Sequence, residues 1–327
     1  MSSVPTGFLT IDKPPGITSH DVVAMVRAVT GIKKVGHTGT LDPFATGVLP
    51  LALGPSTRLI EFLDESIKIY DAEILLGKST DTGDPTGEVI EEAGLPTLDA
   101  AEVAPILQSF VGERMQEPPQ YSAVKVDGKP LYHYARKGEK KRAKPRPIKI
   151  HDIEMGAYAP PKLDVRISCS RGTYARVLAD EMGRALGSVG HLSGLSRFRS
   201  GPFMLNESLD LPALARIVSE DPDRTWEEVL MVRGRGAPRV PWRPREQVLQ
   251  DLAPWIRTPI EVLTHLPLAD VEGAEERRVR QGGRPPAAPP ATPVGGRYLV
   301  VHGARVVAVA EQTGQGPRMV KVLPSSS

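Results

Sequence analysis

The chain has 327 residues, more than one hydrophobic core usually supports, so two domains are expected. Hydrophobic residues make up 40% of the sequence and charged residues 24%, which excludes a mainly disordered protein. The formal net charge is only +2, so the overall charge does not by itself indicate a nucleic-acid-binding protein.

Targeting signals and cysteine usage point to the cytoplasm. The longest apolar stretches, such as 48–54, are far shorter than the ~18–20 residues of a membrane span. Residues 1–7 lack the basic segment followed by an apolar segment that is typical of a secretion signal. The single cysteine, Cys169, excludes an internal disulfide and fits a reducing compartment. We therefore expect a cytoplasmic protein.

The first half of the chain predicts alternating strands and helices. Apolar residues favour a strand at 8–11, and Thr18 and Ser19 can cap a helix that runs to about Thr30. A glycine-rich loop is expected from 36 to 54. The next strand is predicted over 67–76, where Tyr70, Ala72, Ile74 and Leu76 would share one face, and a helix follows over 99–110.

The second half begins with a clear strand and helix and ends in a β-rich unit. Leu163, Val165, Ile167 and Cys169 alternate with polar residues, which indicates a half-buried antiparallel strand. A helix is predicted over 174–186, ending at Gly187. The pattern weakens between about 220 and 258. A helix at 274–281 then precedes short strands predicted over 298–301, 305–310 and 319–323.

Positive charge is concentrated in two runs. Residues 136–149 hold eight Lys or Arg against one acid, and residues 233–246 hold five arginines, also against one acid. Such runs can neutralise phosphates, although for either run alone a solvated loop is the favoured interpretation.

Several common chemistries are unlikely because their motifs are missing from the sequence. No phosphate-binding loop ends in Lys-Ser/Thr, and no G-x-G-x-x-G or G-x-S-x-G is present. The seven histidines lack metal-ligand spacing, and one cysteine cannot build a zinc site. Nucleotide hydrolysis, dinucleotide redox chemistry, zinc hydrolysis and serine esterase chemistry are therefore disfavoured, and no metal is expected.

The most unusual segment is GHTGTLDPFATGVLP at 36–50. Its glycines and prolines fix an irregular backbone, and its apolar residues indicate partial burial. A carboxylate in such a loop, here Asp42, is a candidate nucleophile or base. On physical grounds alone, the favoured interpretation is that Asp42-Pro43 starts a simple turn.

This segment, extended to GHTGTLDPFATGVLPLALG, closely resembles the catalytic motif of the TruB family of tRNA pseudouridine-55 synthases. Other motifs support the resemblance in the same order along the chain: DKPPGITSHD at 12–21, IKIYDAEILLG at 67–77, TDTGDPTG at 80–87, PPQYSAVKVDGKPLYHYAR at 118–136, SRGTYARVLADEMG at 170–183 and LSRFRSGPF at 195–203. The resemblance covers residues 8–205. It implies an α+β fold, with a mixed, largely antiparallel sheet, flanking helices and a small C-terminal β-rich PUA-like domain.

The resemblance assigns three catalytic residues. Asp42 is expected to be the nucleophile that lets uracil leave its ribose and rejoin through C5. Tyr70 is expected to stack on the target uracil, where the family places the base for C5 deprotonation. Arg176 is expected to pair with Asp42 and keep it ionised. The helical spacing of Arg176 and Asp180 alone would favour an ordinary surface ion pair between those two residues instead.

Four further residues are expected at the substrate. By resemblance, Tyr174 lines the pocket and Leu195 forms an apolar wall for the uracil. His37 is expected to stack within the T-loop and replace the target base when that base leaves its stack. Lys13 is expected to face the RNA or, alternatively, to support the active-site loop.

One position departs from the family pattern. Some family members carry an acid just before the last glycine of TDTxDxxG, where it can brace the active-site arginine; here that position is Thr86. Either Asp84 takes over this role or Arg176 relies on Asp42 alone.

The expected function is isomerisation of tRNA uridine 55, with no cofactor, no guide RNA, no membrane and no obligate protein partner. The T-arm would be recognised through its shape and phosphates, with backbone contacts from Lys140, Lys141, Arg142, Lys144 and Arg146. Two alternatives remain: a tRNA-binding or tRNA-folding chaperone, and a synthase acting on another RNA. The expected domains are 1–219 (catalytic, with a thumb-like segment at 118–150), 220–263 (linker or insertion) and 264–327 (PUA-like, RNA-binding).

Overall fold

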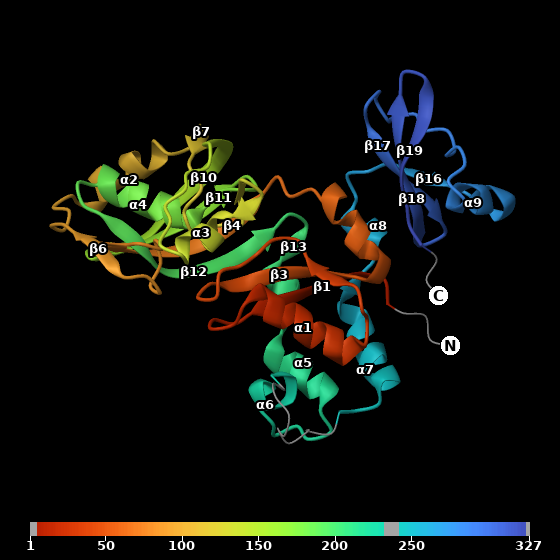
Figure 1. Ribbon diagram of the computed structural model, residues 1–327, viewed down its shortest axis with the longest axis horizontal. Coiled ribbons are helices and arrows are strands. Elements are labelled where there is room, and N and C mark those ends of the chain that lie inside the picture. The colour runs from red at the N-terminus through yellow and green to blue at the C-terminus, as the bar shows by residue number, and fades with distance from the viewer. Residues whose placement is uncertain (1–4, 232–241, 325–327) are drawn as a thin grey trace. The chain divides into compact units, whose positions relative to one another are not determined.

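The computed structural model describes residues 5–231 and 242–324 (Figure 1). The chain forms two compact units, each assembled from separate stretches of sequence. Unit 1 comprises residues 1–41, 49–64 and 206–327, and unit 2 comprises residues 42–48 and 65–205. Most of the arginine-rich run at 233–246 lies outside the described residues.

Unit 1 contains a small sheet, several helices and the C-terminal β-rich part. Strand β1 lies between β14 and β3; β15 also pairs with β1, and β2 pairs with β3. The elements are β1 (Gly7–Lys13), α1 (Ser19–Thr30), β2 (Val35–His37), β3 (Thr46–Leu53, from Leu49 onward), η1 (Gly54–Phe62), β14 (Leu209–Asp210), α5 (Leu211–Val218), α6 (Trp226–Leu230), α7 (Arg245–Leu252), η3 (Ala253–Trp255), β15 (Ile256–Arg257) and α8 (Pro259–Val262).

Helix α1 shows how the local sequence supports this unit. Thr18 is its N-cap and forms a capping box with Asp21, and Gly31 ends the helix in a left-handed conformation. Ser19, which we predicted as a second possible cap, has another role. Its hydroxyl donates to the carbonyl oxygen of Leu41 (3.0 Å) and accepts from the Leu41 amide (2.9 Å). Helix α1 therefore fixes the backbone just before Asp42.

The C-terminal part of unit 1 is a four-stranded sheet in the order β16-β17-β18-β19. Its elements are β16 (Leu268–Asp270), α9 (Gly273–Arg280), β17 (Arg297–His302), β18 (Arg305–Thr313) and β19 (Gly316–Val322). The three strands and the helix predicted here are present. Strand β16 was not predicted, because its three residues are too short to show a period.

Unit 2 is built on a mixed sheet in the order β3-β12-β4-β11-β10-β7. Only the β3–β12 pairing is parallel. The elements are β4 (Lys68–Leu76), β5 (Lys78–Thr80), β6 (Val89–Glu92), α2 (Ala100–Gln108), β7 (Gly112–Gln116), β8 (Lys125–Val126), β9 (Lys129–Pro130), α3 (Leu131–Ala135), β10 (Arg146–Ala159), β11 (Lys162–Cys169), α4 (Ala175–Ala185), β12 (Gly190–Ser200) and β13 (Phe203–Met204), with η2 (Leu205–Glu207) at the boundary to unit 1.

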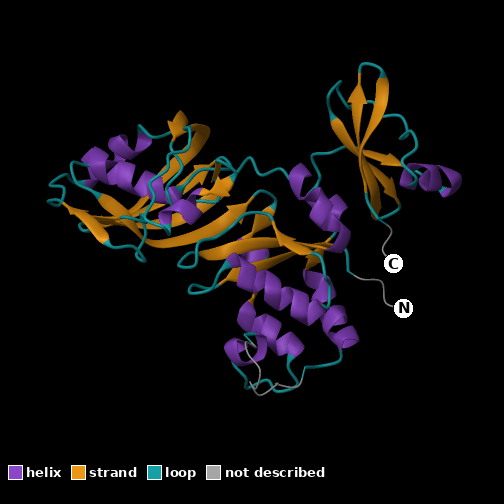
Figure 2. Ribbon diagram, in the orientation of Figure 1, coloured by secondary structure: helices purple, strands orange, loops and turns teal. Residues whose placement is uncertain are grey.

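The core of unit 2 lies between this sheet and two helices (Figure 2). Burial alternates strictly along β4, so Tyr70, Ala72, Ile74 and Leu76 share the inner face as predicted. On β11 the buried residues are Leu163, Val165, Ile167 and Cys169, also as predicted. Val103 and Leu107 of α2 and Leu178, Ala179 and Met182 of α4 complete the cluster. The expected fold class, a largely antiparallel α+β sheet with a small β-rich part, is confirmed.

One prediction of irregular structure was wrong. Residues 36–54, expected as a loop, contain the end of β2 and all of β3, in which every residue from Gly47 to Leu53 is buried. Continuous burial removes the polar alternation that would have revealed the strand. The described part of residues 220–263, a range expected as a linker or insertion, contains α6, α7 and α8. Among the described helices, none has both the length and the hydropathy to cross a bilayer.

The buried Cys169 gives a testable pH dependence. Burial raises the pKa of its thiol from 9.0 to about 11. Because the folded-state pKa is raised, the stability that this group contributes is present below pH 9 and is lost as the pH rises through 11. We expect the free energy of unfolding of wild type to fall by about 2–3 kcal/mol more than that of Cys169→Ala between pH 8 and pH 11. Urea titrations followed by circular dichroism measure this; parallel pH profiles would contradict it.

Candidate active site

Asp42 lies in a turn that leads into β3. The Ala45 amide donates to the Asp42 carbonyl oxygen (3.1 Å), which closes the turn. The side chain of Asp42 is 35% exposed, so its carboxylate is open to solvent on one side.

Arg176 pairs with this carboxylate from the first turn of α4. Its Nε lies 3.0 Å from Asp42 Oδ2, and its Nη2 lies 3.5 Å from Asp42 Oδ1. Arg176 is only 6% exposed, so the guanidinium is buried while the carboxylate is reachable. The alternative pairing with Asp180 does not occur, because Asp180 pairs instead with Arg184 (2.9 Å).

The other donors of Arg176 are held by the protein. Nη1 donates to the carbonyl oxygen of Thr82 (2.9 Å), and Nη2 donates to that of Tyr121 (2.8 Å). The buried Asp84 lies on the same side, with Oδ2 3.8 Å from Nη1. Two carboxylates therefore flank one guanidinium. Asp84 supplies the second acid, which in some family members is expected at the position that Thr86 occupies here.

Tyr70 is buried on β4, close enough to Asp42 for the charge of that carboxylate to act on the phenol. Burial raises the pKa of Tyr70, and the nearby Asp42 adds to this rise, while the guanidinium of Arg197 lowers it. The net direction is upward, so the phenol keeps its proton at neutral pH. A hydrogen bond joins the Tyr70 side chain to Arg197.

The sequence did not reveal Arg197 as a functional residue. It is 1% exposed, pairs with Tyr70 across the β12–β4 register, and donates from Nε to the carbonyl oxygen of Val48 (2.8 Å). Gly47 makes this arrangement possible: it has φ +99°, and a Cβ there would lie 2.4 Å from the Arg197 carbonyl oxygen. One feature of the sequence could have indicated this residue. Arg197 lies two positions after Leu195 on the same strand, so both side chains are expected on the same, inward face.

Tyr174 lies at the start of α4, the helix that carries Arg176, and Leu195 lies on β12, the strand that carries Arg197. Tyr174 is the N-cap of α4, where its amide donates to Gln116 Oε1 (2.8 Å), and its side chain packs against the small cluster of Val124, Leu131 and Ala143. Leu195 packs against the core cluster that contains Tyr70.

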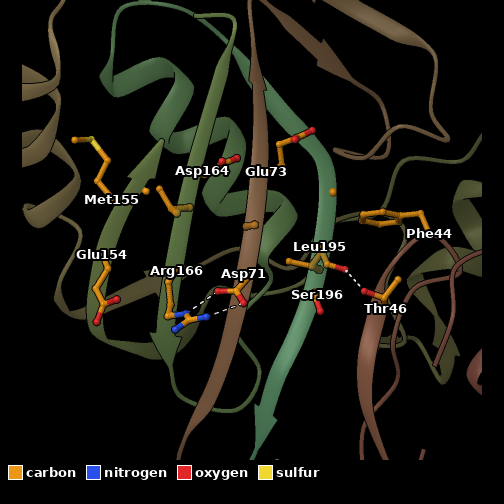
Figure 3. Close-up of a pocket in the computed structure, with 14 residues that line it drawn as sticks. Phe44, Thr46, Asp71, Glu73, Glu154, Met155, Asp164, Arg166, Leu195 and Ser196 are labelled. Atoms are coloured by element: carbon orange, nitrogen blue, oxygen red, sulfur yellow. Dashed lines mark hydrogen bonds and ion pairs between the residues drawn. The ribbon is translucent and has the colours of Figure 1, made fainter. Parts of the chain in front are cut away.

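Leu195 also lines a pocket of about 590 Å³ that does not include Asp42, Tyr70 or Arg176 (Figure 3). Its charged lining residues are Asp71, Glu73, Glu154, Asp164 and Arg166. Arg166 forms a two-pronged ion pair with Asp71 (2.6 and 2.9 Å). Four carboxylates against one guanidinium would repel RNA phosphates, so this pocket is not where the backbone of a nucleic acid would bind.

Two predicted residues belong to unit 1. Lys13 is fully buried, and its ammonium group donates to the carbonyl oxygens of Pro14 and Ile17 (2.8 Å each). This geometry favours the loop-supporting role over direct contact with RNA. His37 is half-buried at the end of β2, and the ring of His20 meets it edge-on at 5.4 Å between centroids.

The predicted backbone-binding residues Lys140, Lys141, Arg142, Lys144 and Arg146 are all exposed. Lys141 lies 3.4 Å from an oxygen of Asp127, and Arg142 lies 3.7 Å from one of Glu117. Such exposed pairs are weak, so they leave these side chains available to phosphates. Among the residues that the structure describes, no cluster of His, Cys, Asp and Glu could hold a metal ion.

Comparison with known proteins identifies the class. A family model described as TruB family pseudouridylate synthase (N terminal domain) matches residues 27–175, a range that includes Asp42, Tyr70 and Asp84. A solved structure, a Cbf5-Nop10-Gar1 complex, aligns with 99% of this chain and 85% of its own at a TM-score of 0.63 and 26% identity. The fold is thus that of a pseudouridine synthase, an isomerase.

Curated relatives narrow this to one family. A tRNA pseudouridine synthase B from Geobacter sulfurreducens is 39% identical over 312 residues, 93% of each chain. Another of that name from Geotalea uraniireducens is 49% identical over 210 residues, 64% of this chain and 68% of that protein. The chain belongs to the TruB family, and the expectation drawn from its motifs is confirmed.

Arg197 provides a prediction for this site. Arg197→Met removes the guanidinium and its hydrogen bond, so the pKa of Tyr70 should rise further. NMR titration of Cζ-labelled tyrosine, with the Tyr70 signal assigned through Tyr70→Phe, measures this shift. Pseudouridine formation should slow by at least about tenfold.

The matched control is Arg199→Met. Arg199 lies on the same strand and donates from Nε to the carbonyl oxygen of Gly201 (2.8 Å). This variant should leave the titration of Tyr70 unchanged. An equal shift in both variants would mean that general loosening of β12, rather than the guanidinium of Arg197, governs Tyr70.

Proposed function

We propose that this chain is a tRNA pseudouridine synthase that converts uridine 55 of the T-loop to pseudouridine. The observation that carries the proposal is the Arg176–Asp42 ion pair, with Asp42 partly open to solvent and the buried Tyr70 close by. The names of the relatives, tRNA pseudouridine synthase B, support tRNA as the substrate.

The reaction breaks the bond between uracil N1 and ribose C1′ and forms one between C5 and C1′. N1 gains a proton and C5 loses one, so substrate and product are isomers. The Asp42 carboxylate can start this reaction by attacking C1′, by attacking uracil C6, or by assisting a glycal route. Each route requires the carboxylate to be presented to the nucleoside in one orientation, which the two contacts from Arg176 provide.

Tyr70 is proposed to stack on the uracil and to take the C5 proton. Its phenol can accept a proton only after giving up its own, and burial disfavours that ionised form. The guanidinium of Arg197 lowers the pKa of Tyr70 and so favours the ionised form when it is needed.

Recognition of the T-arm is proposed to use shape and phosphate contacts first and extruded bases second. The exposed basic run in 118–150 would contact the backbone, and His37 would fill the stack that the target base leaves. The domains are proposed as 1–219, catalytic, 220–263, a linker or insertion, and 264–327, PUA-like and RNA-binding. The protein is proposed to act in the cytoplasm on tRNA without a guide RNA.

Asp42→Asn tests the catalytic assignment. The substitution keeps the size of the side chain and removes its charge, so we expect pseudouridine formation to fall by at least about 10³-fold. Binding of tRNA should change only a few-fold. Mapping of pseudouridine in T-arm transcripts after incubation with purified protein measures the first, and filter binding measures the second.

The control for this experiment is a transcript with cytidine at position 55, which should remain unmodified. Activity of Asp42→Asn within a few-fold of wild type would refute the proposed chemistry. A wild-type protein that binds and refolds tRNA without forming pseudouridine would instead support the chaperone alternative.

Lys140→Ala with Lys144→Ala tests the proposed backbone contact. Each lysine that neutralises a phosphate contributes close to one unit of salt dependence, so the slope of log K against log salt should become shallower by about 2. Lys162→Ala is the matched control, because Lys162 is also exposed but lies 3.2 Å from Glu73 beside the acidic pocket. A slope unchanged in the double variant would exclude this run from the interface.

A further inference from the structure

The turn between β5 and β6 directs three threonine hydroxyls at one residue, the buried Asp84. Thr80 donates to the carbonyl oxygen of Asp84 (2.8 Å). Thr82 and Thr86 donate to the carboxylate itself, both at Oδ1 (2.8 and 2.5 Å). The turn therefore surrounds a single carboxylate with hydrogen-bond donors.

The two oxygens of Asp84 have different surroundings. Oδ1 accepts three hydrogen bonds, from the hydroxyls of Thr82 and Thr86 and from the Thr86 amide (2.9 Å). Oδ2 faces Nη1 of Arg176 at 3.8 Å. Three donors at one oxygen fix the plane of the carboxylate and direct the other oxygen toward the guanidinium.

The position of Arg176 depends on this arrangement. A guanidinium is planar, so contacts along one edge set the direction of the opposite edge. Nη1 is held by the Thr82 carbonyl and faces Asp84, while Nε faces Asp42. Gly83 allows the close approach of this turn to α4. A Cβ at this position would lie 3.2 Å from Arg176 Cβ, and the φ of Gly83 is +73°.

We propose that the Thr86 hydroxyl is a positioning group for the reaction: it holds Asp84 so that Arg176 presents Nε to the Asp42 carboxylate. It acts through Asp84 and Arg176 and does not touch the substrate. This inference rests on the proposed function of the Asp42 site. Thr86 itself is exposed, so a change in its hydroxyl alters this chain of contacts without opening the core.

Thr86 is the better place for a test than Thr82. The Thr82 hydroxyl is shared between Asp84 Oδ1 and the Asp84 carbonyl oxygen, and the Thr82 carbonyl itself binds Arg176. Substitution at Thr82 would therefore disturb the turn and the guanidinium together.

Thr86→Val replaces the hydroxyl with a methyl group and keeps the branched shape. We expect the single-turnover rate of pseudouridine formation at saturating tRNA to fall about 3- to 10-fold, the effect of losing one of the three hydrogen bonds that Asp84 Oδ1 accepts. The dissociation constant for tRNA should stay within about twofold. Thr86→Ser restores the donor and should restore the rate.

Thr80→Val is the matched control, because it removes a hydroxyl of the same turn that binds the backbone of Asp84 and not its carboxylate. It should leave the rate within about twofold. Equal loss in Thr80→Val and Thr86→Val, an unaffected Thr86→Val, or a Thr86→Ser variant as slow as Thr86→Val would each overturn the proposal.

A measurement without turnover separates this proposal from the proposed function. The ¹⁵Nε–Hε signal of Arg176, assigned through Arg176→Lys, should shift in Thr86→Val and keep its wild-type position in Thr80→Val. If wild type forms no pseudouridine but the signal shifts as expected, the proposed function fails while the positioning contact stands. An unshifted signal overturns the positioning role even in an active enzyme.

Discussion

The guanidinium of Arg176 is the group on which the site in unit 2 depends. It is almost fully buried, and burying a charge is costly unless the charge is paired and hydrogen-bonded. Two carbonyl oxygens and two carboxylates meet this requirement, and they come from three separate parts of the sequence, around residues 42, 82–84 and 121. Losing any of them would leave a buried cation less well satisfied, so the active-site loop and the β5–β6 turn are stabilised by the same charge.

The sheet of unit 2 places the remaining groups around this charge. Strand β4 carries Tyr70 on its inner face, and β12 places Arg197 opposite Tyr70. The parallel pairing of β12 with Thr46 and Gly47 anchors the start of β3, directly after the Asp42 turn. The loop that carries Asp42 is thus irregular only between Leu41, which Ser19 holds, and the start of β3. That arrangement fits a site in which a carboxylate must be held within a narrow range of positions.

Periodicity predicted the parts of this fold that have one solvent-exposed face. The alternation on β4 and β11 and the helix that became α4 were visible because polar residues mark the outer face. Strand β3 could not be predicted from the sequence, because seven of its eight residues are buried and no polar face remains. The same physical reason made the segment 36–54 look like a loop rich in glycine.

In the site, sequence motifs predicted some of the residues, whereas one contact depends on the register between two strands. Asp42, Tyr70 and Arg176 could be named from a family resemblance. The cross-strand contact of Arg197 could not, because it depends on the β12–β4 register. That register shifts twice, between Leu192 and Gly194 and again between Arg197 and Arg199. A count of two from Leu195 could place Arg197 on the inward face of β12, but not opposite Tyr70, because that pairing depends on the register between the two strands.

The net charge of +2 conceals a segregation that matters for an RNA-modifying enzyme. Within unit 2, the exposed run 140–146 is basic, while the pocket beside Leu195 carries four acids against one arginine. Fields of opposite sign on one unit orient a polyanion before contact, attracting it to one surface and repelling it from another. A nearly neutral chain can in this way bind RNA in one orientation, which a uniformly basic surface would not impose. Under the proposed function, contacts with a T-arm that approaches from the basic side would offset the cost of extruding a base.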